Sequence, residues 1–163
     1  MASHPPSQRQ APTGSRPRDQ HTVTAPLPDG HLVMDGSFRW TLSSIPAEAG
    51  RVAYVRHQAR VVLSLWALDH LAADAELLLG ELASNAVRHA GTPFTVALSS
   101  DGHHLRGEVS DANLRPPQAH FTDDPDATNG RGLLLVTRIA ERWGTNRLPH
   151  GKRVWFELAI PGQ

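Results

Sequence analysis

Apolar and polar positions follow two regular patterns along the chain from residue 38 onward. Phe38, Trp40 and Leu42 alternate with polar neighbours, which predicts a half-buried strand over residues 38–44. Apolar residues then recur every three or four positions over residues 45–68, which predicts an amphipathic helix with Pro46 in its first turn and Ser44 near its cap. The apolar stripe of this helix comprises Val52, Val55, Ala59, Val62 and Trp66.

A second amphipathic helix is predicted from Leu71 to Ala90, and Gly-Thr-Pro at residues 91–93 should end it. Its core stripe comprises Leu71, Ala75, Leu78, Leu82 and Ala86. Residues 94–100 and 104–111 both alternate with a period of two, and Asp101-Gly102 between them is a strong turn signal. The pattern therefore predicts a β-hairpin after the second helix.

The last part of the chain predicts one helix and two strands. Residues 130–144 have a helical pattern that opens on two glycines, and residues 145–161 are typical of two strands joined by a turn at Pro149 to Gly151. Val154, Phe156, Leu158 and Ile160 share one face of the final strand. The element order β-α-α-β-β-loop-α-β-β predicts an α/β (α+β) two-layer sandwich, in which three helices cover one face of a mixed, mostly antiparallel sheet.

Two segments lack such patterns. Residues 1–37 contain no Phe, Trp or Tyr and are dense in Pro, Ser, Gln and Arg, so they cannot bury enough apolar surface to offset chain entropy. We therefore expect a disordered tail over residues 1–37 and one folded domain over residues 38–163. Residues 114–129 predict a mobile surface loop, in which Asp123, Asp124 and Asp126 face solvent.

Composition narrows the class of function. The chain has 16 basic and 16 acidic residues and so no net charge, which argues against a nucleic-acid binder. No apolar run approaches the ~20 residues of a membrane span, the N-terminus has no secretory signal pattern, and the absence of cysteine excludes disulfides and thiolate metal sites. The ten histidines show no metal-ligand spacing. We expect a cytoplasmic protein with no direct nucleic-acid or membrane partner.

Three polar residues lie four positions apart at the edge of the second helix's apolar stripe: Glu81, Asn85 and His89. At about 100° per residue they occupy a sector of ~80° that overlaps the rim of the stripe. A carboxylate and a carboxamide turned inward are costly unless something pairs with them. The alternative is that all three are solvated and that Glu81 pairs with Arg88 or Arg60.

Two further stretches could carry chemistry. Asp111 ends a predicted strand, where its carboxylate could accept a hydrogen bond from an exocyclic amine or form an ordinary Asx turn. Residues 129–136, with the sequence NGRGLLLV, bring two glycines and Arg131 to the start of a helix. Glycine lets a ligand approach the backbone, and free N–H groups at a helix N-terminus suit phosphate, although glycine before a helix is also common without a ligand.

The order and spacing of these stretches resemble the ATP-binding domain of the gyrase, Hsp90, histidine kinase and MutL superfamily, the Bergerat fold. The elements in common are a helical ExxxNxxxH, a strand-ending Asp111 and a GRGL sequence that opens a helix. More narrowly, "ELASNAVRHA", "VSDAN", "GRGLLLV" and "GKRVWFEL" look like the motifs of small bacterial anti-sigma factor serine/threonine kinases. The resemblance covers residues 38–161.

The resemblance implies a role for each matching position. Glu81 would be the general base for an attacking hydroxyl or water, and Asn85 would bind Mg²⁺ through its amide oxygen, a hard ligand of the kind that Mg²⁺ prefers. Asp111 would accept a hydrogen bond from the adenine amino group. Residues 114–129 would form a lid over ATP, and His89 would lie near the phosphates or this lid. The other nucleotide-binding positions would be Asn113, Gly130, Arg131, Gly132 and Leu133.

Two positions depart from the family pattern. The middle motif usually is DxGxG, but here residues 111–115 are Asp-Ala-Asn-Leu-Arg, with neither glycine. Asn tolerates a left-handed backbone better than most residues, so Asn113 could preserve the turn. Arg153 stands where many relatives carry a small hydroxyl residue, so a water-mediated contact to adenine would be lost.

The resemblance implies an ATP- and Mg²⁺-dependent kinase that phosphorylates a serine of an anti-anti-sigma (antagonist) protein, sequesters a sigma factor and could form a homodimer. An alternative is a non-catalytic, nucleotide-dependent protein-interaction module of the same fold. The altered middle motif favours the module, whereas intact Glu81 and Asn85 favour the enzyme. A third hypothesis, a detached histidine-kinase catalytic domain, is disfavoured because no phosphoacceptor helix pair precedes the domain.

Overall fold

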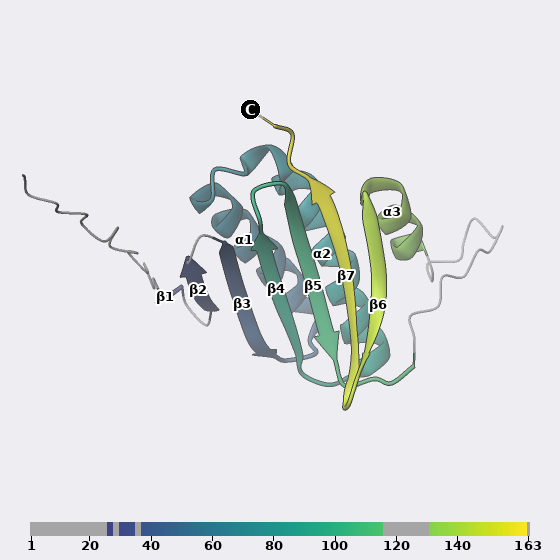
Figure 1. Cartoon of the computed structure of the whole chain (residues 1–163). Helices are drawn as coiled ribbons and strands as arrows, with labels where there is room; N and C mark the ends of the chain where they lie inside the picture. The colour runs from purple at the N-terminus through teal and green to yellow at the C-terminus, as the bar shows by residue number, and fades with distance from the viewer. Residues whose placement is uncertain (1–25, 28–29, 35–36, 116–130, 163) are drawn as a thin grey trace, which may run out of the picture.

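In the computed structural model, seven strands form one sheet and the helices cover one of its faces (Figure 1). The structure describes residues 26–27, 30–34, 37–115 and 131–162. The strand order is β1-β2-β3-β4-β5-β7-β6, and every neighbouring pair is antiparallel. The predicted two-layer sandwich is confirmed, but within the described residues the sheet is antiparallel throughout rather than mixed.

Runs of strands and runs of helical segments follow one another along the chain. In order they are β1 (Pro26–Leu27), β2 (Gly30–Met34), β3 (Phe38–Ile45), α1 (Ala49–Leu65), η1 (Asp69–Leu71), α2 (Ala72–Asn85), η2 (Ala86–Ala90), β4 (Phe94–Ser100), β5 (His104–Asp111), α3 (Arg131–Ile139), β6 (Arg142–Leu148) and β7 (Gly151–Ala159). The π-helical turn η2 continues α2 and ends at Gly91, whose φ of 60° confirms the predicted stop. None of the helices described is long and apolar enough to cross a bilayer.

The core lies between α1, α2 and the inner face of the sheet. The alternating apolar positions of β3, β4, β5 and β7 are mostly buried as predicted, and so are the apolar stripes of both helices, whereas Phe38, Val52 and Ile160 are only partly buried. Trp40, Phe94 and Phe156 are the largest side chains that are fully buried. Removal of these apolar surfaces from water is the main force that holds the two layers together.

Residues 26–27 and 30–34 belong to the sheet, which corrects the predicted boundary of the tail at residue 37. β2 pairs with β3 and inserts Leu32, which is 3% exposed, into the core. A methyl group on Gly30 would lie 2.5 Å from the indole nitrogen of Trp40, so the backbone there packs directly on the indole ring. A strand that buries only one face needs few apolar residues, which is why a polar segment can join the sheet. Residues 1–25 lie outside the described part of the chain.

Two helix boundaries also differ from the prediction. α1 begins after Glu48 rather than at Pro46, because Ser44 still belongs to β3 and has a left-handed φ of 57°. α3 ends at Ile139, because residues 142–148 pair with β7 as strand β6. Pairing with the sheet therefore overrides the helical pattern of residues 142–144.

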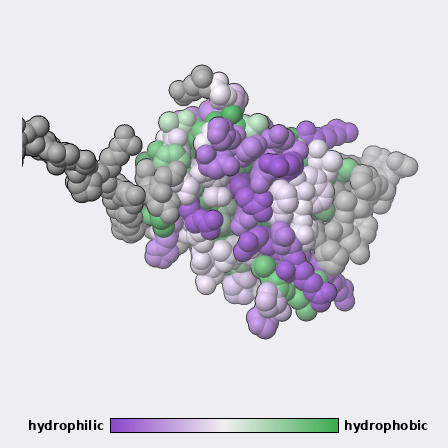
Figure 2. Space-filling view, viewed as in Figure 1, coloured by the Kyte–Doolittle hydropathy of each residue, from purple (hydrophilic) through white to green (hydrophobic). Residues whose placement is uncertain are grey.

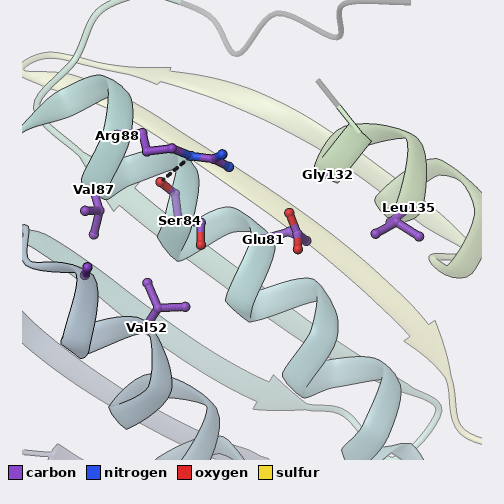
Figure 3. Close-up of a pocket in the computed structure, with 8 residues that line it drawn as sticks. Val52, Glu81, Ser84, Val87, Arg88, Gly132 and Leu135 are labelled. Atoms are coloured by element: carbon purple, nitrogen blue, oxygen red, sulfur yellow. Dashed lines mark hydrogen bonds between the residues drawn. The ribbon is translucent and has the colours of Figure 1, made fainter. Parts of the chain in front are cut away.

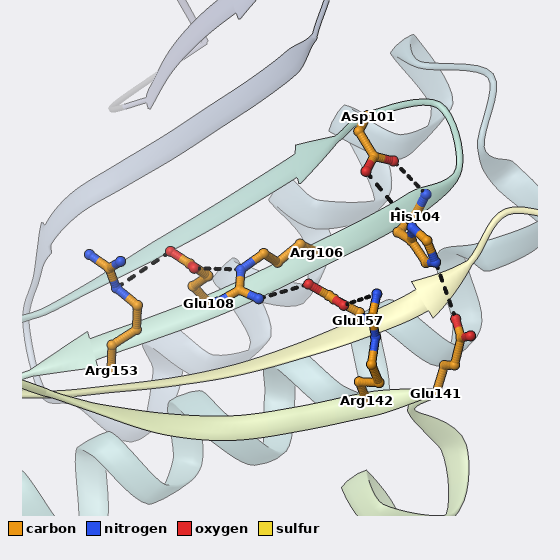
Figure 4. A network of polar contacts seen from close by, with 8 residues as sticks. All are labelled: Asp101, His104, Arg106, Glu108, Glu141, Arg142, Arg153 and Glu157. Atoms are coloured by element: carbon orange, nitrogen blue, oxygen red, sulfur yellow. Dashed lines mark hydrogen bonds and ion pairs between the residues drawn. The ribbon is translucent and has the colours of Figure 1, made fainter.

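The face of the sheet opposite the helices is polar and carries a network of ion pairs (Figures 2 and 4). The Glu157 carboxylate on β7 forms ion pairs with Arg106 on β5 and with Arg142 on β6, each with an N–O distance of 2.8 Å. Arg106 also bonds Glu108 at 2.7 Å, and its guanidinium carbon lies 4.1 Å from the centroid of the Trp155 ring. These cross-strand pairs keep an uncovered face compatible with water.

The turn between β4 and β5 depends on Asp101, whose Oδ1 accepts the backbone N–H groups of His104 (2.7 Å) and His103 (2.8 Å). These hydrogen bonds, that from His104 first, lower the pKa of Asp101. A carboxyl group whose pKa is lower in the folded state stabilises the fold at a pH above its pKa in the unfolded chain. This contribution is lost as the pH falls through the pKa of the folded state.

We expect Asp101→Ala to lower the free energy of unfolding by about 1 kcal/mol or less at neutral pH, because the carboxylate is exposed. The difference from wild type should shrink as pH falls below about 4. Urea unfolding of the wild type and the variant, at neutral pH and in acid, measures this difference in the free energy of unfolding. Asp101→Asn is the control, because its side chain keeps the Oδ1 acceptor. A difference that grew in acid would contradict this account.

Candidate functional site

Glu81 lies on the side of α2 that faces the first turn of α3 (Figure 3). A methyl group built on Gly132 would lie 2.5 Å from Glu81 Oε2, so a side chain at position 132 would displace the carboxylate. Two residues predicted for the site, 51 positions apart in the chain, are therefore brought together. The sequence order did not require this contact, which arises because α2 and α3 pack side by side.

The alternative partners of Glu81 are engaged elsewhere. Arg60 donates to Glu76, with a distance of 2.6 Å between Nε and Oε1. Arg88 donates to the backbone oxygen of Ser84 at 3.4 Å and to Asn85 Oδ1 at 3.3 Å. Within the described residues, neither arginine neutralises Glu81, so its half-buried carboxylate remains available to a ligand.

A hollow of about 510 Å³ opens beside Glu81 in the helix layer (Figure 3). Val52 of α1 and Val87 of η2 line one side, and Gly132 and Leu135 of α3 line the other. Its volume lies within the range of small-ligand sites. The carboxylate thus stands at the edge of a surface that is mostly apolar.

Asn85 is half-buried one turn after Glu81, and its Oδ1 accepts a hydrogen bond from Arg88. That oxygen is the atom predicted to bind Mg²⁺, so the guanidinium and a metal ion would compete for it. The side chain of His89 is exposed, and its backbone oxygen accepts from Asn113 Nδ2 at 2.7 Å. Asn113 thereby ties the end of η2 to the loop after β5. In the described part of the chain, no group of three or more His, Asp or Glu side chains could hold a metal ion.

Asp111 is a buried carboxylate at the end of β5, with 4% of its side chain exposed. Its Oδ1 accepts from Lys152 Nζ at 2.8 Å and from the backbone N–H of Asn113 at 2.8 Å. The second bond is the Asx turn that the sequence left open as an alternative. The first is an ion pair that the sequence analysis missed, and the Lys152 side chain is only 8% exposed.

Register explains why Lys152, rather than Arg153, meets Asp111. Asp111 and Lys152 are partners across β5 and β7, and both point to the inner face of the sheet. Arg153 points to the opposite face, where its Nε lies 3.3 Å from Ser110 Oγ and 3.5 Å from Glu108 Oε2. The signal was present in the sequence, because Lys152 is in phase with the apolar positions of β7.

The remaining predicted positions lie around the start of α3. The side chain of Leu133 is 3% exposed and packs in the core, so only its backbone can face a ligand. Arg131 is the first residue of α3. Gly130, the Arg131 side chain and most of the predicted lid, residues 116–129, lie outside the described residues.

The family model of the histidine kinase-like ATPase domain matches residues 45–158, which is more than half of the chain. The chain belongs to the histidine kinase-like ATPase domain family. The matched stretch contains every residue of the candidate site. Membership of an ATPase-domain family implies that this histidine kinase-like ATPase domain binds a nucleotide.

Among solved structures, the domain is similar to the crystal structure of the RsbU and RsbW domains of Rv1364c from Mycobacterium tuberculosis, with a TM-score of 0.54 and 21% sequence identity. The match covers 76% of this chain and 34% of that one, so the histidine kinase-like ATPase domain spans about a third of that chain's length. At this identity the likeness concerns the fold alone. No curated protein sequence matches the chain.

Proposed function

We propose that this chain is a regulator of the anti-sigma factor type, which binds Mg²⁺-ATP, phosphorylates a serine of an antagonist protein and sequesters a sigma factor. The observation that carries the proposal is the approach of Glu81 to Gly132, which sets a carboxylate beside the N-terminal turn of a helix. Helix N-termini favour phosphate, and general bases lie next to the group that reacts. The family match and the fold in common with a structure containing an RsbW domain support this choice.

Glu81 would act as the general base in this reaction. Its carboxylate would take the proton of the serine hydroxyl, whose oxygen then bonds to the γ-phosphorus of ATP. The bond between that phosphorus and the β–γ bridging oxygen breaks, and ADP leaves. Such a transfer depends mainly on positioning and on neutralisation of charge.

The residues that would hold the metal ion fit the chemistry of Mg²⁺. Asn85 offers a neutral amide oxygen one turn from Glu81, and triphosphate oxygens and water would complete the shell. The bound ion would neutralise charge on the phosphates. Release of Asn85 Oδ1 by Arg88 would accompany binding, and the freed guanidinium would lie close to the triphosphate.

The hollow beside Glu81 would receive the phosphoacceptor. Val52, Val87 and Leu135 offer it an apolar surface, and Glu81 stands at its edge. A serine flanked by apolar residues would bury its neighbours there while its hydroxyl faces the carboxylate. The apolar part of this surface would favour a protein segment over free water as the acceptor.

Two measurements on the full chain test the proposal. Isothermal titration calorimetry with Mg²⁺-ATP should show saturable binding, and no binding at about 1 mM would contradict the proposal at its first step. γ-Labelled ATP should then label serine in one of the candidate antagonist proteins of the same genome. Binding of nucleotide without transfer to any of them would favour the non-catalytic module.

Asn85→Ala should weaken Mg²⁺-ATP binding by about tenfold or more while it leaves the melting temperature of the nucleotide-free protein nearly unchanged. The reason is that Asn85 is half-buried and its side chain bonds an exposed arginine rather than the core. Calorimetry and thermal unfolding measure the two effects. Asn146→Ala, on the exposed edge strand β6, is the matched control. An equal loss of stability without nucleotide would mark Asn85 as structural.

One observation favours the second candidate, a nucleotide-dependent interaction module without transfer. Asp111 Oδ1 already accepts hydrogen bonds from Lys152 and from the Asn113 backbone. A hydrogen bond from adenine to this carboxylate would therefore add less binding free energy than one to a carboxylate without other partners. Weak nucleotide binding would suit a protein that exchanges protein partners better than it would suit an enzyme that turns over ATP. The labelling experiment decides between the two.

A further inference from the structure

The guanidinium of Arg56 on α1 packs against α2 at a glycine. A methyl group built on Gly80 would lie 2.6 Å from Nη2 and 2.7 Å from Cζ of Arg56, so a larger residue at position 80 would displace the guanidinium. Nε of Arg56 is buried and has no hydrogen-bond partner in the part of the chain that the structure describes. A buried polar atom without a partner is rare in folded proteins and calls for a reason. Packing against Gly80, rather than an ion pair, holds this cation in place.

The carboxylate one turn along the seam between α1 and α2 is already occupied. Glu76 lies four residues before Gly80, and its two oxygens accept from Arg60 at 2.6 Å and 3.0 Å. Among the described residues, Arg56 forms no ion pair. Its side chain is partly exposed and only Nε is buried without a partner, so the terminal nitrogens reach solvent. Arg56 thus offers a cation and a fork of N–H donors to a group from outside the domain.

This unpaired cation continues the surface of the hollow beside Glu81. Val52 precedes Arg56 by four residues on α1, Ser84 follows Gly80 by four on α2, and both Val52 and Ser84 line the hollow (Figure 3). Residues four apart on a helix are neighbours on one face. One helical turn is about 5.4 Å, which two residues of extended chain span at about 3.3 Å each. A segment bound in the hollow therefore reaches the guanidinium when it extends by a few residues along the seam.

We infer that the protein segment bound in the hollow carries an acidic side chain that pairs with Arg56. The inference rests on the proposed function, in which the hollow receives the phosphoacceptor, and it adds a charge requirement to the apolar one. A carboxylate suits this position because it can accept two parallel hydrogen bonds from a guanidinium. Complementary charges at an interface select partners and fix their register. Arg56 is thus a specificity-determining residue for a segment with apolar residues next to the serine and a glutamate or aspartate a few positions away.

Synthetic serine peptides test this charge requirement. In one series, serine stands between two leucines and a single glutamate is placed roughly two to five residues away on either side. The reference series has glutamine in place of the glutamate. Fluorescence anisotropy with the full chain and Mg²⁺-ADP should show, at one position at least, about tenfold or more tighter binding of the glutamate peptide. No gain at any position, or no binding of any peptide below about 1 mM, would overturn the inference.

Arg56→Gln should reduce the preference for glutamate to about twofold or less, because it removes the charge. Arg56→Lys keeps the charge and should retain part of the preference. Arg39→Gln is the matched control, since Arg39 is exposed on β3 and points away from the core, into which its neighbour Trp40 points. It should leave the preference at the wild-type value. A preference that survived Arg56→Gln would overturn the inference, and the far-ultraviolet spectrum and melting temperature of each variant verify its fold.

Failure of this inference is distinguishable from failure of the proposed function. A preference for glutamate that depends on Arg56, without transfer of label from γ-labelled ATP to any antagonist or peptide, would support the acidic partner and contradict the kinase. Transfer of label to serine without any preference for glutamate would support the kinase and overturn the role of Arg56.

Discussion

Glu81→Gln is expected to lower the rate of phosphoryl transfer to the antagonist by about 10²–10⁴-fold, because the amide keeps the shape of the carboxylate but cannot accept the proton. ATP binding should remain close to wild type, since Glu81 would contact the attacking hydroxyl rather than the nucleotide. Label transfer from γ-labelled ATP gives the rate, and calorimetry gives the affinity. A lower transfer rate with unchanged ATP affinity would identify Glu81 as the general base, whereas a residue that only supports the fold would affect both quantities.

Glu76→Gln is the control for this experiment. Glu76 lies on the same helix, bonds Arg60 and does not line the hollow. Its replacement should alter neither rate nor affinity appreciably. If Glu81→Gln transferred phosphate as fast as wild type, Glu81 would not be the base.

Gly151→Ala should lower the free energy of unfolding by about 3 kcal/mol or more. Gly151 has a φ of 139°, a conformation that favours glycine, and an added methyl group would overlap the carbonyl oxygen of Asp111. The methyl would also lie 2.8 Å from the Cα of Ala112, so two segments of backbone would have to move. Urea unfolding followed by circular dichroism measures the loss.

Gly102→Ala separates the two causes. Gly102 also has a positive φ, 86°, but an added methyl group there would meet no atom within 4 Å. It should therefore cost only the backbone strain, about 1 kcal/mol. Equal losses at the two positions would show that crowding against Asp111 contributes nothing.

The sequence predicted the elements whose apolar pattern is strong. Trp40 and Leu42 alternate into the core, and the stripe from Leu71 to Ala86 is buried from end to end. It also predicted Glu81 and Gly132 as members of one site, but only through a family resemblance, because their contact depends on the packing of α2 against α3. Local periodicity cannot supply a contact between distant elements.

The failures have physical causes as well. β2 was assigned to the tail because residues 30–34 contain few apolar side chains, whereas backbone pairing with β3 and the burial of Leu32 hold this strand in the sheet. Lys152 was overlooked because a lysine within a strand is ordinarily solvated. Only the register of β5 against β7 reveals that a carboxylate lies opposite and makes an inward ammonium tolerable.

The two outermost strands bear on how copies of this chain could associate. β1 is only 2 residues long, and β6 at the other border exposes Arg142, Asn146 and Arg147. Short borders and charged side chains are poor templates for strand addition from another molecule. Within the described residues, the borders of the sheet therefore disfavour a homodimer that extends one continuous sheet through both subunits, and favour one built from other surfaces.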